Sequence, residues 1–344
     1  MSDIDSLAAV ALGDVADLQG IVGQRGAPRP SKYPVNEAMI GLWCDAVGDD
    51  NPAYQDPEWA AGSRWGGIIA PATTLNMWTL PGFRRIHAVG EPLDVVTQTL
   101  NAAGFTSVAA VQNDHTYHRP LRPGDRLSQI QHLGWISALK CTALGEGYFF
   151  DIVSDFVTAE GEEVGRATMR IFKWAPGTGG TAVSSSSAAD AVAEDVAPPP
   201  TAVAQRVRGA DLTPASVLPT WSLPLTATRI TALAAATLDY NDVHFEQRAA
   251  VRAGAPDIYL NILGSSGLMN RYLTDWAGPE AELKSARVVL RNQNHPGDVV
   301  TFSGVVLSVA DTGDDTRSLV EIEVRAQNVR GVHQVGVVTL EVDR

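Results

Sequence analysis

A repeated order of short motifs divides the chain into two comparable halves. Residues 49–54 precede a Pro-Gly-Asp turn at 123–125, and residues 239–244 precede another at 296–298. The interval from the first Asp to the turn's Pro is 74 residues (49 to 123) in the first half and 57 (239 to 296) in the second. One Pro-Gly-Asp turn is ordinary, but its recurrence at a matching place indicates a duplicated fold.

A segment rich in small and polar residues separates the two halves. Its sequence, residues 175–200, contains three consecutive prolines, which neither continue a helix nor supply central strands. A chain of 344 residues is long enough for about two domains. The expected division is an N-terminal extension over 1–25, a first, non-catalytic domain over 26–174, a linker over 175–205 and a catalytic domain over 206–344.

The hydrophobic pattern predicts strands after each turn and one helix before it. Apolar and polar residues alternate through Val320, Ile322 and Val324, as in half-buried antiparallel strands. Residues 255–276 carry apolar side chains near helical spacing, although Gly264 to Gly267 weaken the middle of that helix. The predicted fold class is α+β, with two antiparallel sheets each wrapped around a central helix.

Composition excludes several classes of function. There are 26 Lys and Arg against 39 Asp and Glu, a formal charge of −13, so no broad positive field attracts nucleic acid or a membrane surface. Two cysteines, Cys44 and Cys141, are too few for a disulfide framework. The first 20 residues have acids where a secretory signal needs bases, and no apolar run reaches about 18 residues. We therefore expect a cytoplasmic protein without nucleic-acid or membrane partners.

Asp239 and His244 are the most informative pair for chemistry. They lie five residues apart in a segment that favours a turn. An imidazole titrates near neutral pH and a carboxylate can orient it, so together they can hold a water molecule and move its protons. The same spacing also fits a helix-capping Asp beside an ordinary histidine, and spacing alone does not decide.

The first half differs at this motif. Tyr54 follows Asp49 by five residues, where the second half has His244, and a tyrosine with a pKa near 10 moves protons poorly at neutral pH. We expect turn and capping chemistry from residues 49–52. His115 and His118 are three apart on a predicted strand and face opposite sides, so we expect no metal site.

Arginines near both turns are candidates for binding phosphate, although solvated basic turns fit them equally well. They are Arg119, Arg122 and Arg126 in the first half and Arg287 and Arg291 in the second.

The second-half motif resembles that of the MaoC-type, or (R)-specific, enoyl-CoA hydratases. Asp239, Asn241 and His244 match its Asp-x-Asn-x-x-His pattern, whereas Tyr54 departs from it in the first half. The resemblance implies a double hotdog fold and a hydro-lyase that needs no cofactor. It further implies catalytic Asp239 and His244, substrate binding near Asn241 and Tyr54, and an oxyanion donor near Asn261.

A narrower resemblance concerns the heteromeric hydratases of steroid side-chain degradation in actinobacteria. Residues 242–244, 260–263 and 272–279 are similar to their catalytic subunit, and residues 115–119, 143–147 and 170–173 to its partner. The chain thus resembles the two subunits fused. This resemblance implies that the substrate is a steroid or other bulky acyl-CoA in cholesterol catabolism, and that the protein is a homodimer. The acyl group would bind in a pocket near Tyr54, Trp65 and Trp78. The phosphates of coenzyme A would bind at Arg122, Arg287 or Arg291. The relatives' extra domain, which docks a side-chain-cleaving aldolase, has no counterpart in these residues, which puts such docking in doubt.

Other activities remain compatible with the sequence. One is a hydratase or dehydratase of straight-chain fatty acyl-CoA, and a thioesterase is disfavoured by the Asp-x-Asn-x-x-His match. Another is a non-catalytic acyl-CoA-binding subunit of a β-oxidation complex.

Overall fold

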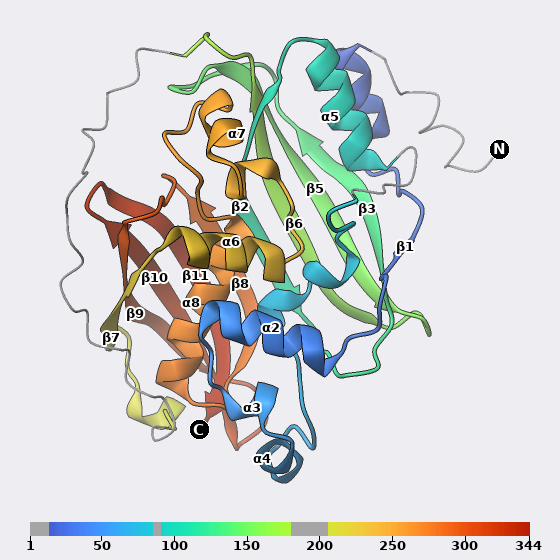
Figure 1. The fold of residues 1–344 in the computed structure, drawn as a ribbon. Coiled ribbons are helices and arrows are strands. Elements are labelled where there is room, and N and C mark those ends of the chain that lie inside the picture. Colours follow the sequence, from blue (N-terminus) through green and yellow to red (C-terminus); the bar gives the residue numbers. More distant parts are fainter. Residues whose placement is uncertain (1–13, 85–90, 180–205) are drawn as a thin grey trace.

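One continuous antiparallel sheet forms the back of the molecule, and the helices lie in front of it (Figure 1). The computed structural model describes residues 14–84, 91–179 and 206–344. Within these residues the sheet has eleven strands, in the order β1-β3-β5-β6-β2-β8-β11-β10-β9-β7, with β4 paired to β5. The first half of the chain supplies one side of this sheet and the second half the other.

The first half contributes six strands: β1 (Arg29–Pro30), β2 (Ser107–Tyr117), β3 (Leu127–Ile136), β4 (Lys140–Cys141), β5 (Glu146–Thr158) and β6 (Glu163–Trp174). Its helical elements are η1 (Val15–Ile21), α2 (Glu37–Val47), α3 (Pro52–Gln55), α4 (Pro57–Gly62), η2 (Ala72–Thr74), η3 (Met77–Thr79) and α5 (Pro92–Ala102).

The second half contributes the strands β7 (Val217–Pro224), β8 (Glu282–Leu290), β9 (Val299–Asp311), β10 (Arg317–Asn328) and β11 (Gly331–Asp343). Its helical elements are η4 (Gly209–Asp211), α6 (Ala227–Ala236), η5 (Asp242–His244), α7 (Gln247–Arg252) and α8 (Ile262–Ala277).

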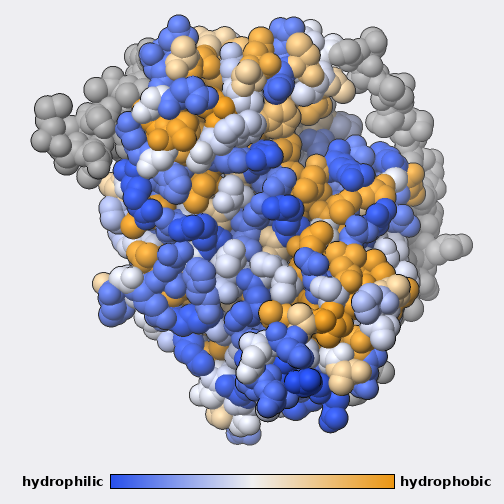
Figure 2. All heavy atoms as spheres, turned by 180° about the vertical axis from the view of Figure 1, so that it is seen from behind, coloured by the Kyte–Doolittle hydropathy of each residue, from blue (hydrophilic) through white to orange (hydrophobic). Residues whose placement is uncertain are grey.

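The alternating strand pattern is confirmed in β10. Val320, Ile322 and Val324 are completely buried, while the residues between them face away from the core. Figure 2 shows the molecule from behind, where hydrophilic side chains are mixed with smaller apolar groups. Asp114 of β2 and Arg287 of β8 form an ion pair at 3.2 Å between these paired strands. The sheet therefore buries one face and leaves much of the other to solvent.

The central helix of the second half is α8. It begins at Ile262, seven residues later than the predicted span of 255–276, because the residues just before it form an irregular segment ending in the N-cap Asn261. The glycines that weaken the middle of α8 have a structural reason. A Cβ added at Gly267 would lie 2.6 Å from Cζ2 of Trp43 in α2, so the absence of a side chain lets the two halves approach closely.

The first half has a shorter helix in the corresponding place. Both α5 and α8 directly precede a long strand of the sheet, but α5 has 11 residues and α8 has 16. The extra length of the first half lies before α5, where residues 72–79 form the short turns η2 and η3. Apolar residues of α5 pack with η1 and strands of the first half in a separate core cluster.

The two expected sheets meet edge to edge as one. In this β2–β8 seam, Gln112 pairs with Val289 and Thr116 with Ser285 in antiparallel register. The main core cluster contains side chains of both halves, among them Trp43 and Leu268. The repeated motifs therefore correspond to two similar units that share one sheet and one core.

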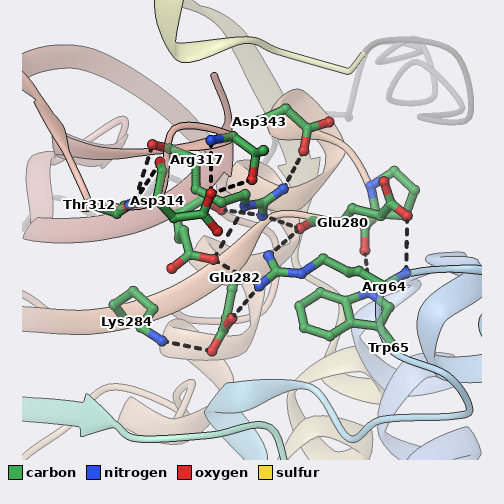
Figure 3. Close-up of polar contacts among 12 residues, drawn as sticks. Arg64, Trp65, Glu280, Glu282, Lys284, Thr312, Asp314, Arg317 and Asp343 are labelled. Carbon is green, nitrogen blue, oxygen red and sulfur yellow. Dashed lines mark hydrogen bonds and ion pairs between the residues drawn. The ribbon is translucent and has the colours of Figure 1, made fainter.

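Charged side chains also join the halves (Figure 3). Arg64, which follows α4, donates hydrogen bonds to Glu282 at 3.1 Å and to Glu341 at 2.8 Å. The indole of Trp65 donates to the carbonyl oxygen of Pro279 at 3.1 Å. Arg317 binds Asp343 and the same Glu341 from within the second half. A single arginine of the first half thus contacts two strands of the second.

The predicted extension and linker lie partly outside the described residues, which omit 1–13 and 180–205. Within the predicted extension, η1 is packed into the first half, with Leu18 fully buried.

Candidate active site

The Asp239 and His244 side chains lie beside each other at the N-terminal end of α8. Helix α6 ends at Ala236 with Thr237 as its C-cap, and Leu238 adopts a left-handed conformation with φ of 57°. This turns the chain so that the Asp239 Oδ2 atom lies 3.6 Å from Nε2 of His244. The side chains are 28% and 8% exposed, respectively, so the carboxylate is the more accessible partner.

A backbone carbonyl orients the His244 ring. Nδ1 lies 2.7 Å from the carbonyl oxygen of Tyr259, an acceptor only, so Nδ1 carries the proton and donates it. In the neutral ring, Nε2 is then the free acceptor on the side facing Asp239. A carboxylate and an unprotonated nitrogen side by side are both acceptors, which is an arrangement that can bind a water molecule and take its proton.

Asn261 connects the carboxylate to α8. Its Nδ2 donates to Asp239 Oδ2 at 3.0 Å and to Thr237 Oγ1 at 2.9 Å, while its Oδ1 accepts from the N–H of Gly264 at 2.9 Å as the helix N-cap. The first N–H groups of a helix have no carbonyl of the same helix to bind. The N–H groups of Ile262 and Leu263 therefore stand at the positive end of the helix dipole, at the end of α8 where Asn261 contacts Asp239.

The Pro-Gly-Asp turn of the second half supports this segment. The N–H of Leu260 donates to the carbonyl oxygen of Asn294 at 3.0 Å, and His295 Nδ1 lies 3.0 Å from the carbonyl oxygen of Ile258. The same segment supplies the Tyr259 carbonyl, and the Tyr259 ring packs edge-on against both His244 and His295. Burial and the nearby Asp239 raise the pKa of Tyr259 to about 12. The sequence did not predict this supporting role of Asn294 and His295, although both residues directly precede the recurring Pro-Gly-Asp turn.

The corresponding loop of the first half is closed and differently used. Asp49 is 1% exposed, and burial raises its pKa to about 7 despite a 3.0 Å hydrogen bond from the N–H of Asn51. The Tyr54 side chain is also buried and hydrogen-bonds to Asn270 of α8, and its burial raises its pKa. The raised pKa of Tyr54 makes its phenol a poor agent for proton transfer at neutral pH. The pKa of Asp49 would suit proton transfer, but its carboxyl group is enclosed by protein and closed to substrate.

Of the remaining candidate binding residues, Asn241 lies in the loop that carries Asp239 and His244, whereas Tyr54 and Trp78 lie elsewhere. Tyr54 lines a separate cavity with Trp65 and the α8 residues Asn270 and Thr274, more than one helical turn beyond Asn261. Trp78 is buried elsewhere and donates from its indole N–H to Thr74. Asn241 is exposed and contributes its backbone carbonyl to the N–H of His244.

The phosphate candidates and the histidine pair are likewise separate from Asp239. Arg287 pairs with Asp114, Arg122 and Arg291 are exposed, and Arg119 binds Asp125 and Glu162. His115 is buried beside Asn76, whereas His118 is exposed beside Glu163. Of the predicted residues, the structure brings together Asp239, His244 and Asn261.

The chain is similar to known proteins in sequence and in fold. A model of the FAS1-like dehydratase domain region matches residues 21–167. The beta subunit of 3-oxo-4,17-pregnadiene-20-carboxyl-CoA hydratase from Mycobacterium tuberculosis is 41% identical over 125 residues, which are 36% of this chain and 92% of that protein. The chain belongs to the FAS1-like and MaoC-like dehydratase family. The alpha subunit of that M. tuberculosis hydratase is 37% identical over 168 residues, 47% of this chain and 53% of the subunit.

Solved structures share the fold. A MaoC-like dehydratase superposes with a TM-score of 0.69 at 20% identity, over 94% of this chain and 99% of the other. A double hotdog protein from M. tuberculosis superposes with a TM-score of 0.63 at 14% identity, over 97% of this chain and 99% of the other. The double hotdog prediction is thereby confirmed, and matches to both hydratase subunits fit a fusion of the two. The chain spans about half the length of the alpha subunits that it matches. No described helix combines the length and apolar character needed to cross a membrane.

Proposed function

We propose that the chain is an enoyl-CoA hydratase that adds water across the α,β double bond of an acyl-CoA thioester. The observation that carries the proposal is the Asp239 and His244 pair at the N-terminus of α8, with Nδ1 of His244 committed to a carbonyl. The relatives named as hydratase subunits support the same reaction.

The site's groups perform the reaction in a simple order. His244 Nε2 takes a proton from a water molecule held against Asp239, and the water oxygen bonds to the β-carbon. The electron pair of the double bond moves toward the thioester carbonyl, whose negative oxygen is stabilised by N–H groups at the start of α8. A proton then returns to the α-carbon. One water is consumed and nothing is oxidised or reduced, so the reaction needs no cofactor.

The proposed substrate is a steroid side-chain 2-enoyl-CoA. The printed names of both matched subunits, which refer to a pregnadiene carboxyl-CoA, support this choice. A homodimer and a side-chain-cleaving aldolase partner are part of the same proposal.

Two substitutions test the reaction. Asp239→Asn and His244→Ala each remove one proton-handling group, so hydration of the enoyl thioester, followed by loss of its absorbance, should fall by about 100- to 10,000-fold. The matched controls are Asp315→Asn and His118→Ala, at exposed side chains outside the site. Near-normal turnover in either site variant would contradict the proposal.

The substrate is tested with purified wild-type protein. A steroid side-chain enoyl-CoA should be hydrated faster than crotonyl-CoA. Faster turnover of crotonyl-CoA would keep the hydratase and reject the steroid, favouring a straight-chain enzyme. Tight binding of acyl-CoA without any turnover would instead identify a non-catalytic binding subunit.

A further inference from the structure

The Asn261 side chain makes three hydrogen bonds in the interior of the site. It is 2% exposed and contacts the carboxylate, a buried threonine and the helix terminus at once. The assignment of its amide is fixed by its partners. A backbone N–H can only donate, so the atom 2.9 Å from Gly264 N is Oδ1, and Nδ2 faces Asp239.

Thr237 reinforces this orientation. Its hydroxyl donates to the carbonyl oxygen of Ala234 at 3.0 Å, so its oxygen accepts from Asn261 Nδ2. Thr237 is completely buried, and an amide group between it and Gly264 has little freedom to rotate. The donor that reaches Asp239 is therefore held in place from two sides.

We propose that Asn261 is a positioning residue, which fixes the Asp239 carboxylate relative to His244 and the first N–H groups of α8. This inference rests on the proposed function. The hydrogen bond occupies Oδ2, the oxygen nearest His244, and among the described residues Oδ1 receives no donor. The carboxylate is thereby oriented with one oxygen held by the protein and the other available to water or substrate.

Helix capping alone does not account for an asparagine here. Ser and Asp cap helices about as well, but neither has a donor that could reach the Asp239 carboxylate while its oxygen accepts from Gly264. A serine hydroxyl donates and accepts through one oxygen on a shorter side chain, whereas the asparagine amide places the acceptor and the donor on two separate atoms. The two roles can thus be separated by substitution, because a residue can keep the cap and lose the donor.

Asn261→Ser is the main test. It keeps an N-cap oxygen and removes the Nδ2 donor that reaches Asp239, without adding charge. The kcat of hydration should therefore fall by about 10- to 100-fold, the worth of a hydrogen bond to a charged group. KM and the melting temperature should change little, because neither substrate contacts nor the cap is lost. Asn36→Ser is the matched control, since Asn36 caps α2 in the same way far from the site.

Asn261→Asp adds a readout that a purely structural role would not change. It keeps the cap and puts a carboxylate oxygen at the position of Nδ2, next to the Asp239 carboxylate. Two carboxylates in one place hold a proton more tightly, so the acid limb of the pH profile of kcat/KM should move to higher pH. No such shift is expected for Asn261→Ser or for Asn36→Asp.

The inference fails if both Asn261 variants keep the wild-type kcat and pH profile while Asp239→Asn is inactive. It also fails if kcat is lost only in proportion to folded protein, as measured by the melting temperature and active-site titration. An active Asp239→Asn variant would instead overturn the proposed function itself, so the two failures are distinguishable.

Discussion

At the scale of residues, the sequence predicted the pair of side chains that we propose to react, and the structure places them side by side, but the sequence did not predict what orients them. Asp239 and His244 were predictable because a turn with that spacing brings side chains together. The Tyr259 carbonyl was not, because every residue has a carbonyl and only the fold selects one. Tyr54 was predicted for substrate binding and lines a cavity with Trp65. Its contact with Asn270 of the other half was not predictable, because it depends on how the halves pack.

Asp49 should make the stability of the protein depend on pH. Its pKa is about 7 in the folded chain against 3.8 in the reference state, so the folded state holds the proton more tightly. The contribution of Asp49 to the free energy of unfolding is therefore greatest below about pH 4, and this contribution is lost as the pH rises to about 7. Asp49→Asn, which keeps an acceptor for Asn51, should raise the melting temperature at pH 8 by several degrees and change it little at pH 4.

Thermal unfolding at the two pH values measures this effect. The control is Asp50→Asn, at the exposed neighbouring carboxylate. An Asp49→Asn variant that is less stable than wild type at pH 8 would show that the ionised carboxylate is favoured in the folded state.

At the scale of elements, periodicity found α8 but misplaced its start. Apolar residues continue before the helix, through Leu260, because the extended segment there is also buried. Helix α5 was not located, since one full-length central helix was expected in each half and the first half has turns and a short helix instead. A sequence pattern indicates burial more directly than it indicates which backbone conformation achieves it.

Gly267→Ala should destabilise the protein even though Ala favours helices. The added methyl would meet the Trp43 ring at 2.6 Å, and such overpacking costs about 1–3 kcal/mol, which exceeds the gain in helix propensity of up to about 1 kcal/mol. Gly41→Ala in α2 is the matched control, because a Cβ there meets nothing within 4 Å. Urea unfolding should show a lower free energy of unfolding for the first variant and a slightly higher one for the second. Equal gains in both would contradict the close approach of α2 and α8.

At the scale of the whole molecule, the duplication was readable and the shared sheet was not. Repeated turns predict two similar units, but edge pairing depends on β2 and β8 each having a free side in register with the other. The ion pairs of Arg64 likewise join segments more than 200 residues apart, a separation at which sequence spacing carries no information.

Cutting the chain within residues 180–205 should therefore leave the two halves together. A protease site introduced there would allow cleavage of the folded protein. We expect both fragments to elute as one species in native size-exclusion chromatography, with hydration activity retained, because described residues on both sides of that segment form the β2–β8 seam and the common core. Separate elution of the fragments would mean that the covalent link holds them.

The same seam has a consequence for dilution. Two subunits on separate chains associate with a concentration-dependent equilibrium, so each loses its partner when the protein becomes scarce. Here both halves of the sheet belong to one polypeptide, which replaces that equilibrium with an intramolecular one at an effective concentration in the millimolar range. The pairing that builds the active unit is thus independent of how many copies the cell makes, and the ratio of the two halves is always one.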